Sequence, residues 1–299
     1  MTDQNFKCGY VAIIGRPNMG KSTLLNHMLG LKLSITSRKP QTTRHQILGV
    51  KTVDNGQFIF VDTPGIHSGG NRAINRYMNR AASSVIHDVD VVLFLVQAMK
   101  WTDEDELVLK KLEQVDVPVV LLVNKVDKIA DKDQLLPFIA EISEKYDFAN
   151  VMPISATQGH NVQQLEDYLL TKLPEASAYF QDDEFTDRST RFLVAEIIRE
   201  KLVRELGNEL PYQTTVEIEQ YKDEEKITRI HALILVETKG QKVIVIGDKG
   251  ARLKSIGTKA RKDIENLIDR KVFLKLWVKV KSGWSDSEAS LRSLGYDAD

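Results

Sequence analysis

Three short, continuously apolar runs constrain the fold of this chain more than any other feature of its sequence. They span residues 91–96, 117–123 and 151–154, and the strand expected over the first of them begins at residue 89. Strands that lack polar alternation are typical of sheets covered on both faces. Stretches with helical spacing flank and separate the runs, at residues 71–87, 103–115, 133–146 and 162–172. The alternation predicts an α/β domain in which helices cover both faces of an open, mostly parallel sheet.

The alternating pattern begins near the N-terminus and stops well before the C-terminus. Before the apolar runs it predicts a strand at 10–15, a helix at 20–29 and a hairpin of strands at 47–53 and 57–62. Residues 174–187 are polar and acidic, and 299 residues are more than one ordinary domain needs. We therefore expect a first domain over 1–176, a linker over 177–190 and a second domain over 191–299.

The second domain has a different order of elements and a different charge. The pattern predicts a helix at 190–206, strands at 212–221 and 227–237, helices at 241–246 and 251–268, and a strand at 272–280. The whole chain has a net charge of −1, but residues 239–281 hold 13 Lys/Arg against 4 Asp/Glu. An α+β domain with this basic segment points to a polyanion as its partner.

Cysteine usage and hydropathy indicate a cytoplasmic protein. Cys8 is the only cysteine, so no disulfide can form within the chain. The N-terminus lacks the apolar stretch of a secretory signal, and no apolar run is long enough to span a bilayer. Peripheral contact with a membrane stays open.

A phosphate-binding loop lies between the first strand and the first helix. Residues 15–22 read G-R-P-N-M-G-K-S and fit the pattern G-x-x-x-x-G-K-[ST]. Lys21 is placed to contact the β- and γ-phosphates, and the Ser22 hydroxyl to ligate Mg²⁺. The nucleotide-contacting residues expected here are Gly15, Gly20, Lys21, Ser22 and Thr23.

Two further segments complete a nucleotide site. The first segment is D-T-P-G at the end of a strand. Asp62 is expected to hold Mg²⁺ through water, and the backbone N–H of Gly65 is expected to contact the γ-phosphate.

The second segment, residues 124–127, reads N-K-V-D, and Asp127 can accept two hydrogen bonds from guanine that adenine cannot donate. A buried carboxylate left unpaired by adenine would be costly. Asn124 ties the loops together, the stem of Lys125 covers the base, and Ser155 with Ala156 adds a backbone contact. GTP or GDP is the expected nucleotide.

This ordered set, with two threonines in the loop between, resembles the translation-factor-like P-loop GTPases. The resemblance implies that Thr43, or else Thr42, closes over Mg²⁺, so that Lys21, Thr43 and Gly65 act in catalysis. Ile66 stands where Ras-like enzymes have a glutamine that orients the attacking water. An isoleucine cannot do so by hydrogen bonding, which predicts that the water is oriented by other means and that intrinsic hydrolysis is slow. In some of these relatives an asparagine corresponding to Asn18 binds K⁺; here Asn18 either does so or only shapes the loop.

Residues 245–253 read V-I-G-D-K-G-A-R-L and resemble the signature of KH domains, with the element order of type II. In KH domains the G-x-x-G loop packs against four nucleotides of single-stranded RNA, and the resemblance implies the same role here. The expected RNA-binding residues are Gly247, Lys249, Gly250, Arg252 and Lys254. Trp277 and Trp284 either stack bases or pack in the core, and core packing is favoured for Trp277. The lysines of the last strand are read as a mixture of RNA-facing and water-facing groups.

A GTPase domain followed by a type II KH domain resembles the Era family of bacterial ribosome-assembly GTPases over nearly the whole chain. The resemblance implies a monomer that binds 16S rRNA near its 3′ end and acts in 16S rRNA processing and 30S subunit assembly. It also implies contact with the inner membrane. Two alternatives remain: a membrane-associated regulatory GTPase whose basic domain contacts anionic lipid, and a non-enzymatic assembly factor with a structural nucleotide.

Overall fold

The computed structural model describes residues 6–37, 39, 42–65, 73–207 and 213–296. The chain forms two units. Unit 1 comprises Met1–Ser34, Thr43–Asn71 and Asn75–Asp187. Unit 2 comprises Ile35–Thr42, Arg72–Ile74 and Arg188–Asp299. The second unit therefore takes in two short segments from the first third of the chain.

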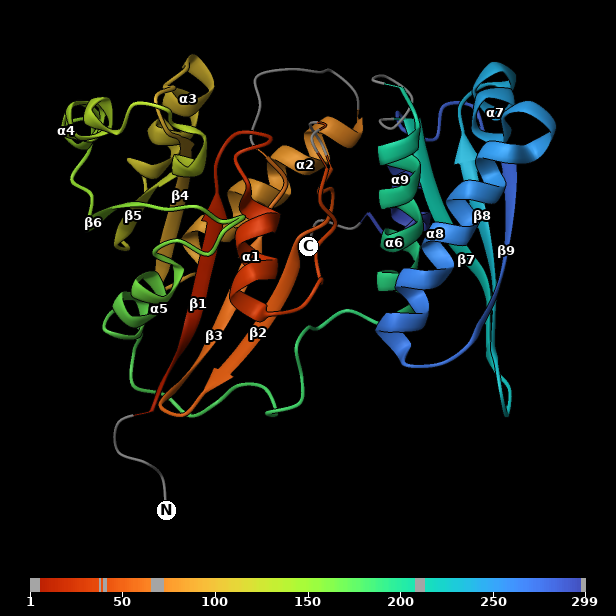
Figure 1. Ribbon diagram of the computed structural model, residues 1–299, viewed down its shortest axis with the longest axis horizontal. Helices are drawn as coiled ribbons and strands as arrows, with labels where there is room; N and C mark the ends of the chain where they lie inside the picture. Colours follow the sequence, from red (N-terminus) through yellow and green to blue (C-terminus); the bar gives the residue numbers. More distant parts are fainter. Residues whose placement is uncertain (1–5, 38, 40–41, 66–72, 208–212, 297–299) are drawn as a thin grey trace. The chain divides into compact units, whose positions relative to one another are not determined.

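A six-stranded sheet organises unit 1 (Figure 1). Its strands are β1 (Lys7–Ile14), β2 (Ile47–Val53), β3 (Gly56–Asp62), β4 (Val91–Gln97), β5 (Val119–Asn124) and β6 (Asn150–Pro153). They lie in the order β2-β3-β1-β4-β5-β6, and only β2 and β3 pair antiparallel. Every residue of β3 and β5 is buried, as expected for strands covered on both faces. The predicted mostly parallel sheet is confirmed.

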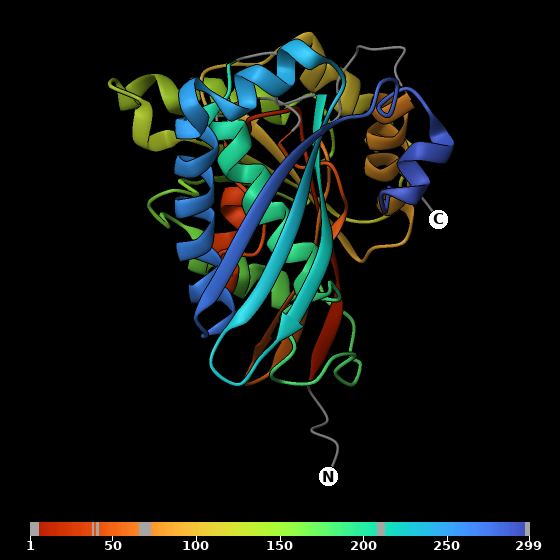
Figure 2. The same cartoon turned by 90° about the vertical axis from the view of Figure 1, so that its right-hand side faces the viewer.

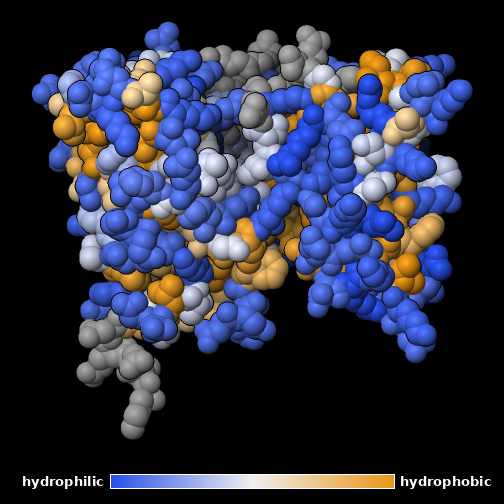
Figure 3. Space-filling model, in the orientation of Figure 1, coloured by the Kyte–Doolittle hydropathy of each residue, from blue (hydrophilic) through white to orange (hydrophobic). Residues whose placement is uncertain are grey.

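Helices cover both faces of this sheet. They are α1 (Lys21–Leu29), α2 (Ala73–Ser84), α3 (Asp103–Leu112), α4 (Leu135–Ser143) and α5 (Val162–Leu170), and α2 belongs to unit 1 from its third residue. The side chains of α3 and Ile142 of α4 pack into the apolar core of β1, β4 and β5. The outer side of α4 is also apolar: Leu136 is 74% exposed, and hydrophobic side chains gather over this helix in Figure 3.

Unit 2 is a three-stranded sheet with its main helices on one face (Figure 2). Its elements are α6 (Thr190–Glu205), β7 (Thr214–Asp223), β8 (Thr228–Val236), α7 (Lys239–Ile246), α8 (Ala251–Ile268), β9 (Val272–Val280) and α9 (Glu288–Ser293). β8 pairs antiparallel with β7 and parallel with β9. Apolar residues of α6 and α8 form the core against the sheet. The predicted α-β-β-α-α-β order is confirmed, with α9 added at the end.

The helices in the described part of the chain include none that combines the length and the apolar character needed to cross a membrane.

Candidate functional site: a guanine-nucleotide site and a basic groove

The loop between β1 and α1 needs glycine at both positions that the motif specifies. Gly15 has φ 146°, and a Cβ there would lie 2.5 Å from the carbonyl oxygen of Leu95. Gly20 has φ 103°, and a Cβ there would lie 2.5 Å from Nδ2 of Asn124. A side chain at either position would therefore collide with neighbouring structure, while the bare backbone leaves its N–H groups free to face an anion.

Lys21, the first residue of α1, is buried in the loop that precedes it. Its Nζ donates hydrogen bonds to the carbonyl oxygens of Gly15 at 2.9 Å and Arg16 at 3.1 Å. Burial lowers the pKa of Lys21 to about 8, an effect that the nearby Asp62 opposes. The amine thus sits where phosphate oxygens can replace the two carbonyls and restore a favourable environment for its charge.

A carboxylate and three hydroxyls meet at the end of β3. Asp62 Oδ2 accepts hydrogen bonds from Ser22 Oγ and from Ser34 Oγ, each at 2.7 Å. Ser22 Oγ is also 2.8 Å from Thr43 Oγ1. Burial raises the pKa of Asp62, and the bonds from Ser34 and Ser22 oppose that rise. Asp62 Oδ1 is buried and has no hydrogen-bond partner among the described residues.

The two neighbouring threonines that sequence cannot separate differ in their contacts. Thr43 reaches Ser22, whereas the Thr42 hydroxyl donates to the carbonyl of Lys39 at 2.7 Å. This placement favours Thr43 as the cation ligand, which stays a prediction. Thr23 is partly buried on α1.

Gly65 lies directly against the phosphate loop. A Cβ on it would be 2.8 Å from the nitrogen of Pro17. The next residue, Ile66, lies outside the described residues.

Asn124, at the end of β5, ties three loops together. Its Nδ2 donates to the carbonyl of Met19 at 2.7 Å. Its Oδ1 accepts from the backbone N–H of Ala156 at 3.0 Å and of Lys125 at 2.7 Å. A fully buried amide thus holds the phosphate loop, the N-K-V-D segment and the loop after β6 in one arrangement. The role expected of Asn124 has a clear geometric basis.

Asp127 and Lys125 are arranged around the space expected for the base. Asp127 Oδ1 accepts a hydrogen bond from Ser155 Oγ at 2.6 Å. Asp127 is exposed, so the burial expected for this carboxylate has to come from the base that covers it. Lys125 Nζ donates to the carbonyl of Asn18 at 2.6 Å, and burial lowers its pKa. Asn18 itself is exposed, with φ 65°.

Two parts of this site were missed in the sequence. Ser34 lies far along the chain from Asp62, and a lone serine in a loop carries no signal. Arg16 forms a buried ion pair with Asp105, its Nε 3.0 Å from both carboxylate oxygens. Asp105 also completes a capping box with Thr102 at the start of α3. The T-x-x-D spacing was readable as a cap, but its partner in the phosphate loop was not.

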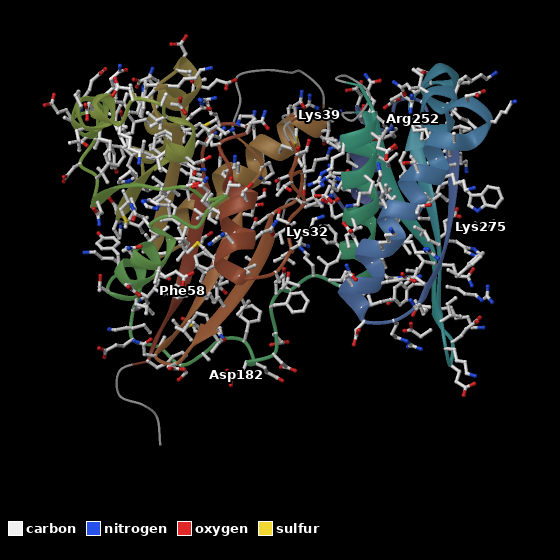
Figure 4. The ribbon with its side chains drawn as sticks, viewed as in Figure 1. Lys32, Lys39, Phe58, Asp182, Arg252 and Lys275 are labelled. Atoms are coloured by element: carbon white, nitrogen blue, oxygen red, sulfur yellow. The ribbon has the colours of Figure 1, made fainter. Side chains whose placement is uncertain are left out.

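The G-D-K-G segment of unit 2 is a sharp turn between α7 and α8. Gly247 has φ 73° and ψ −179°, and Gly250 has φ 82° and ψ 6°. Lys249 lies between them with φ 45° and is exposed. Arg252 is half-buried and donates to the carbonyl of Ile244, at the end of α7 (Figure 4). The turn presents main chain and a cation to solvent at the start of α8.

A groove of about 520 Å³ runs beside this turn, between α8 and β9. It is lined by Gly250 of the turn and, from α8, by Leu253, Lys254, Gly257, Thr258 and Arg261. Lys254 and Arg261 are exposed at its rim. Gly257 faces Leu276 of β9 across the groove, and a Cβ there would lie in van der Waals contact with that side chain, 3.4 Å from its Cδ1. The groove has an apolar floor and a basic rim, which suits unpaired bases and their phosphates.

The two tryptophans of this unit have opposite environments. Trp277 is 50% exposed on β9, so the expectation of core packing was wrong. It shares its face of the strand with Lys275 and Lys279, and this parity was readable in the sequence. Trp284 is fully buried and packs near Tyr296. Base stacking is therefore open to Trp277 and closed to Trp284.

Comparison with protein families gives two matches along the chain. Residues 10–125 match the family described as 50S ribosome-binding GTPase. Residues 209–285 match the KH domain family. Among relatives, "GTPase Era" of Pseudomonas fluorescens is 59% identical over 297 residues, which cover 99% of each chain. "GTPase Era" of Pseudomonas aeruginosa is 59% identical over 290 residues, covering 97% of this chain and 95% of that one.

Two solved structures match nearly the whole chain. One is Era in complex with MgGDPNP and nucleotides 1506–1542 of 16S ribosomal RNA, with a TM-score of 0.95, 40% identity and coverage of 98% and 100%. The other is a variant of Aquifex aeolicus Era bound to GDP.AlF4−, with a TM-score of 0.94, 39% identity and the same coverage. On this evidence the chain belongs to the Era family of GTPases.

Proposed function

We propose that this protein hydrolyses GTP to GDP and binds 16S rRNA near its 3′ end, in 16S rRNA processing and 30S subunit assembly. The observation that carries the proposal is the presence, in one chain, of a nucleotide site and a basic G-x-x-G groove. A solved Era holds both MgGDPNP and a 16S rRNA segment. We assign the nucleotide chemistry to residues 1–176, a linker to 177–190 and RNA binding to 191–299.

Mg²⁺ fits the cluster at the end of β3. The unpaired, buried Oδ1 of Asp62 and the hydroxyls of Ser22 and Thr43 are hard oxygen ligands of the kind that this ion prefers. We assign Ser22 and Thr43 as direct ligands and Asp62 as a ligand through water. A bound ion would neutralise charge on the β- and γ-phosphates.

Three groups of the chain act on the phosphates in this proposal. Lys21 exchanges its two carbonyl partners for β- and γ-phosphate oxygens. The N–H of Gly65 donates to the γ-phosphate, and Thr43 closes over it. An isoleucine cannot orient water by hydrogen bonding, so residue 66 leaves hydrolysis slow until a partner assists.

Guanine specificity is assigned to the segment held by Asn124. Asp127 accepts from N1–H and the exocyclic amine of the base, and the Ala156 region contacts the carbonyl. Lys125 covers one face of the ring with its stem. Asp127 is exposed before binding, so a bound base is what buries its carboxylate. Guanine pairs with the carboxylate as it covers it, whereas adenine would bury it without a hydrogen bond, which is costly.

Asn18 is proposed as a K⁺ ligand, since its side chain is exposed in the phosphate-binding loop. Turnover of GTP is expected to be faster in K⁺ than in Na⁺ at equal ionic strength, and Asn18→Ala is expected to remove the difference. Equal wild-type rates in the two salts would leave Asn18 with a shaping role only.

RNA binding is assigned to the turn and groove of unit 2. Gly247 and Gly250 bring main chain against the backbone of the strand, while Lys249, Arg252 and Lys254 attract its phosphates. This protein is proposed to be a cytoplasmic monomer that touches the inner membrane peripherally. The competing proposal is a regulatory GTPase whose basic unit binds anionic lipid.

The deciding experiment is RNA crosslinking with sequencing, in the presence of a GTP analogue and of GDP. Reads confined to the 3′ region of 16S rRNA are expected. Lys254→Ala should reduce them, whereas Lys226→Ala, an exposed lysine in the β7–β8 turn, should not. Scattered reads, together with tighter binding to anionic vesicles than to RNA at equal salt, would favour the lipid alternative.

A further inference from the structure

The open face of the sheet in unit 2 carries a row of aromatic and basic side chains. This row, the β9 row, consists of Phe273, Lys275, Trp277 and Lys279, and all four are exposed. Phe273 and Trp277 are 43% and 50% exposed, although both are large apolar rings. In Figure 2 this face of the sheet is turned to the viewer and α6 and α8 lie behind it.

The charge around the β9 row is positive. Lys275 Nζ lies 4.5 Å from the ring centre of Trp277, and Cζ of Arg229 on β8 lies 5.2 Å from that of Phe273. β9 contains no acidic residue, and the exposed Glu217 lies on the far edge strand β7, separated from Trp277 by Leu233 of β8. Figure 4 shows Lys275 projecting from β9 away from the helices.

We propose that the β9 row is a second RNA-binding surface, on which unpaired bases stack after leaving the groove. The proposal rests on RNA binding by the groove, because Phe273 and Lys275 also line that groove. An RNA strand can therefore pass over β9 without a break. Aromatic faces accept any base, and neighbouring cations hold the phosphates.

The spacing of the row fits this use. Phe273 and Trp277 are four residues apart on one face, about 13 Å along an extended strand. Lys275 lies between them and Lys279 beyond. On binding, Lys275 would exchange the face of Trp277 for a phosphate oxygen, which leaves that ring available to a base. Arg229 also forms an ion pair with Glu224, with its Nε 2.9 Å from Oε2, so Lys275 and Lys279 are the cations assigned to the phosphates.

The test compares two single-stranded RNAs on the full chain, one of four nucleotides and one of about twelve. Trp277→Ala is expected to weaken binding of the longer RNA about tenfold, which corresponds to about 1.4 kcal/mol, and to leave the shorter RNA unchanged. Trp277→Phe should retain most of the affinity. Tyr179→Ala, which removes an exposed aromatic ring of unit 1, is the matched control.

A fluorescence measurement on the wild type and on the conservative variant Trp277→Phe tests the proposal even if Trp277→Ala folds poorly. The longer RNA should quench tryptophan emission of the wild type, and Trp277→Phe should remove that quenching. The proposal would be overturned if Trp277→Ala bound the longer RNA as tightly as the wild type does. It would also be overturned if Trp277→Ala lost affinity for anionic vesicles but not for RNA. If the wild type binds neither RNA, the groove proposal itself fails; if Lys254→Ala weakens both RNAs and Trp277→Ala only the longer one, both stand.

Discussion

The ionisation of Lys21 depends strongly on its surroundings. Its pKa falls to about 8 in the nucleotide-free protein, because the charged amine is buried among carbonyl groups. Between pH 8 and the ordinary lysine value the unfolded chain binds more protons than the folded one. Stability therefore gains from this group as pH rises through that window. Phosphates reverse the preference, since they favour the charged amine.

Nucleotide binding should consequently take up protons at alkaline pH. At pH 9 we expect uptake of about one proton per GDP, and affinity about tenfold weaker than at pH 7. Calorimetry in buffers of different ionisation enthalpy measures the uptake. Lys21→Arg, which keeps its charge, should show none, and a wild type without uptake would contradict the assignment.

Asp127 should determine the choice of base by the direction of its hydrogen bonds. In Asp127→Asn the amide donates where the carboxylate accepts, so GTP affinity should fall at least about 100-fold while xanthosine triphosphate gains. Competition binding with both nucleotides checks this exchange. Asp131→Asn, an exposed carboxylate in the following loop, is the control. Parallel losses for both nucleotides would assign Asp127 a structural role instead.

At the scale of elements, α3 supports the phosphate loop through one ion pair. Asp105 is fully buried, so Asp105→Ala leaves Arg16 without a partner and should lower the free energy of unfolding by about 3 kcal/mol. Asp103→Ala, exposed in the same first turn, should change it by less than about 0.5 kcal/mol. Denaturant unfolding with and without GDP compares them. Equal effects of the two changes would show that the pair is dispensable.

The two glycines of the G-x-x-G turn should differ in what they tolerate. Gly250 has the left-handed helical conformation that asparagine also adopts, and nothing lies within 4 Å of an added Cβ. Gly247 has a conformation open almost only to glycine, with Arg252 Cβ 2.7 Å from an added Cβ. Gly250→Asn should therefore keep the melting temperature, and Gly247→Asn should lower it by several degrees. Similar melting temperatures would contradict the argument.

Elements were predictable where the pattern was local and strong. The expected strand at 272–280 is β9 to the residue, whereas α4 starts later than expected because a 3₁₀ turn at Lys132–Gln134 precedes it. Segments that contact phosphate and base were readable because their spacing is fixed by the ligand. Ser34 and the Arg16–Asp105 pair were not, because their partners are brought close only by the fold.

At the scale of the whole molecule, the chain enters unit 2 three times. The first entry, residues 35–42, is bound to α6: the N–H of Thr36 donates to Glu200, Arg204 donates to the carbonyl of Thr36, and Arg199 to that of Thr42. The next residue, Thr43, belongs to the proposed Mg²⁺ cluster. If Thr43 binds Mg²⁺, we expect a shift of this segment on α6 to change nucleotide affinity, and nucleotide binding to change the segment's hold on α6 by the same factor.

A fragment of residues 1–187 should reveal this dependence. It lacks α6, so amide exchange at residues 35–37 should become much faster than in the full chain. Exchange in β3 should stay unchanged, which serves as the internal control. Equal protection of residues 35–37 in fragment and full chain would show that α6 does not hold them.

The membership of residues 35–42 in unit 2 also affects the order in which a new chain matures. Synthesis delivers the N-terminal part first, and domains generally fold in that order. These residues leave the ribosome early, yet the helix that binds them is made only after residue 190. The loop leading to Thr43 must wait for it. A growing chain can therefore form its phosphate loop before α6 is available, and we expect the segment that leads to Thr43 to stay unanchored until then.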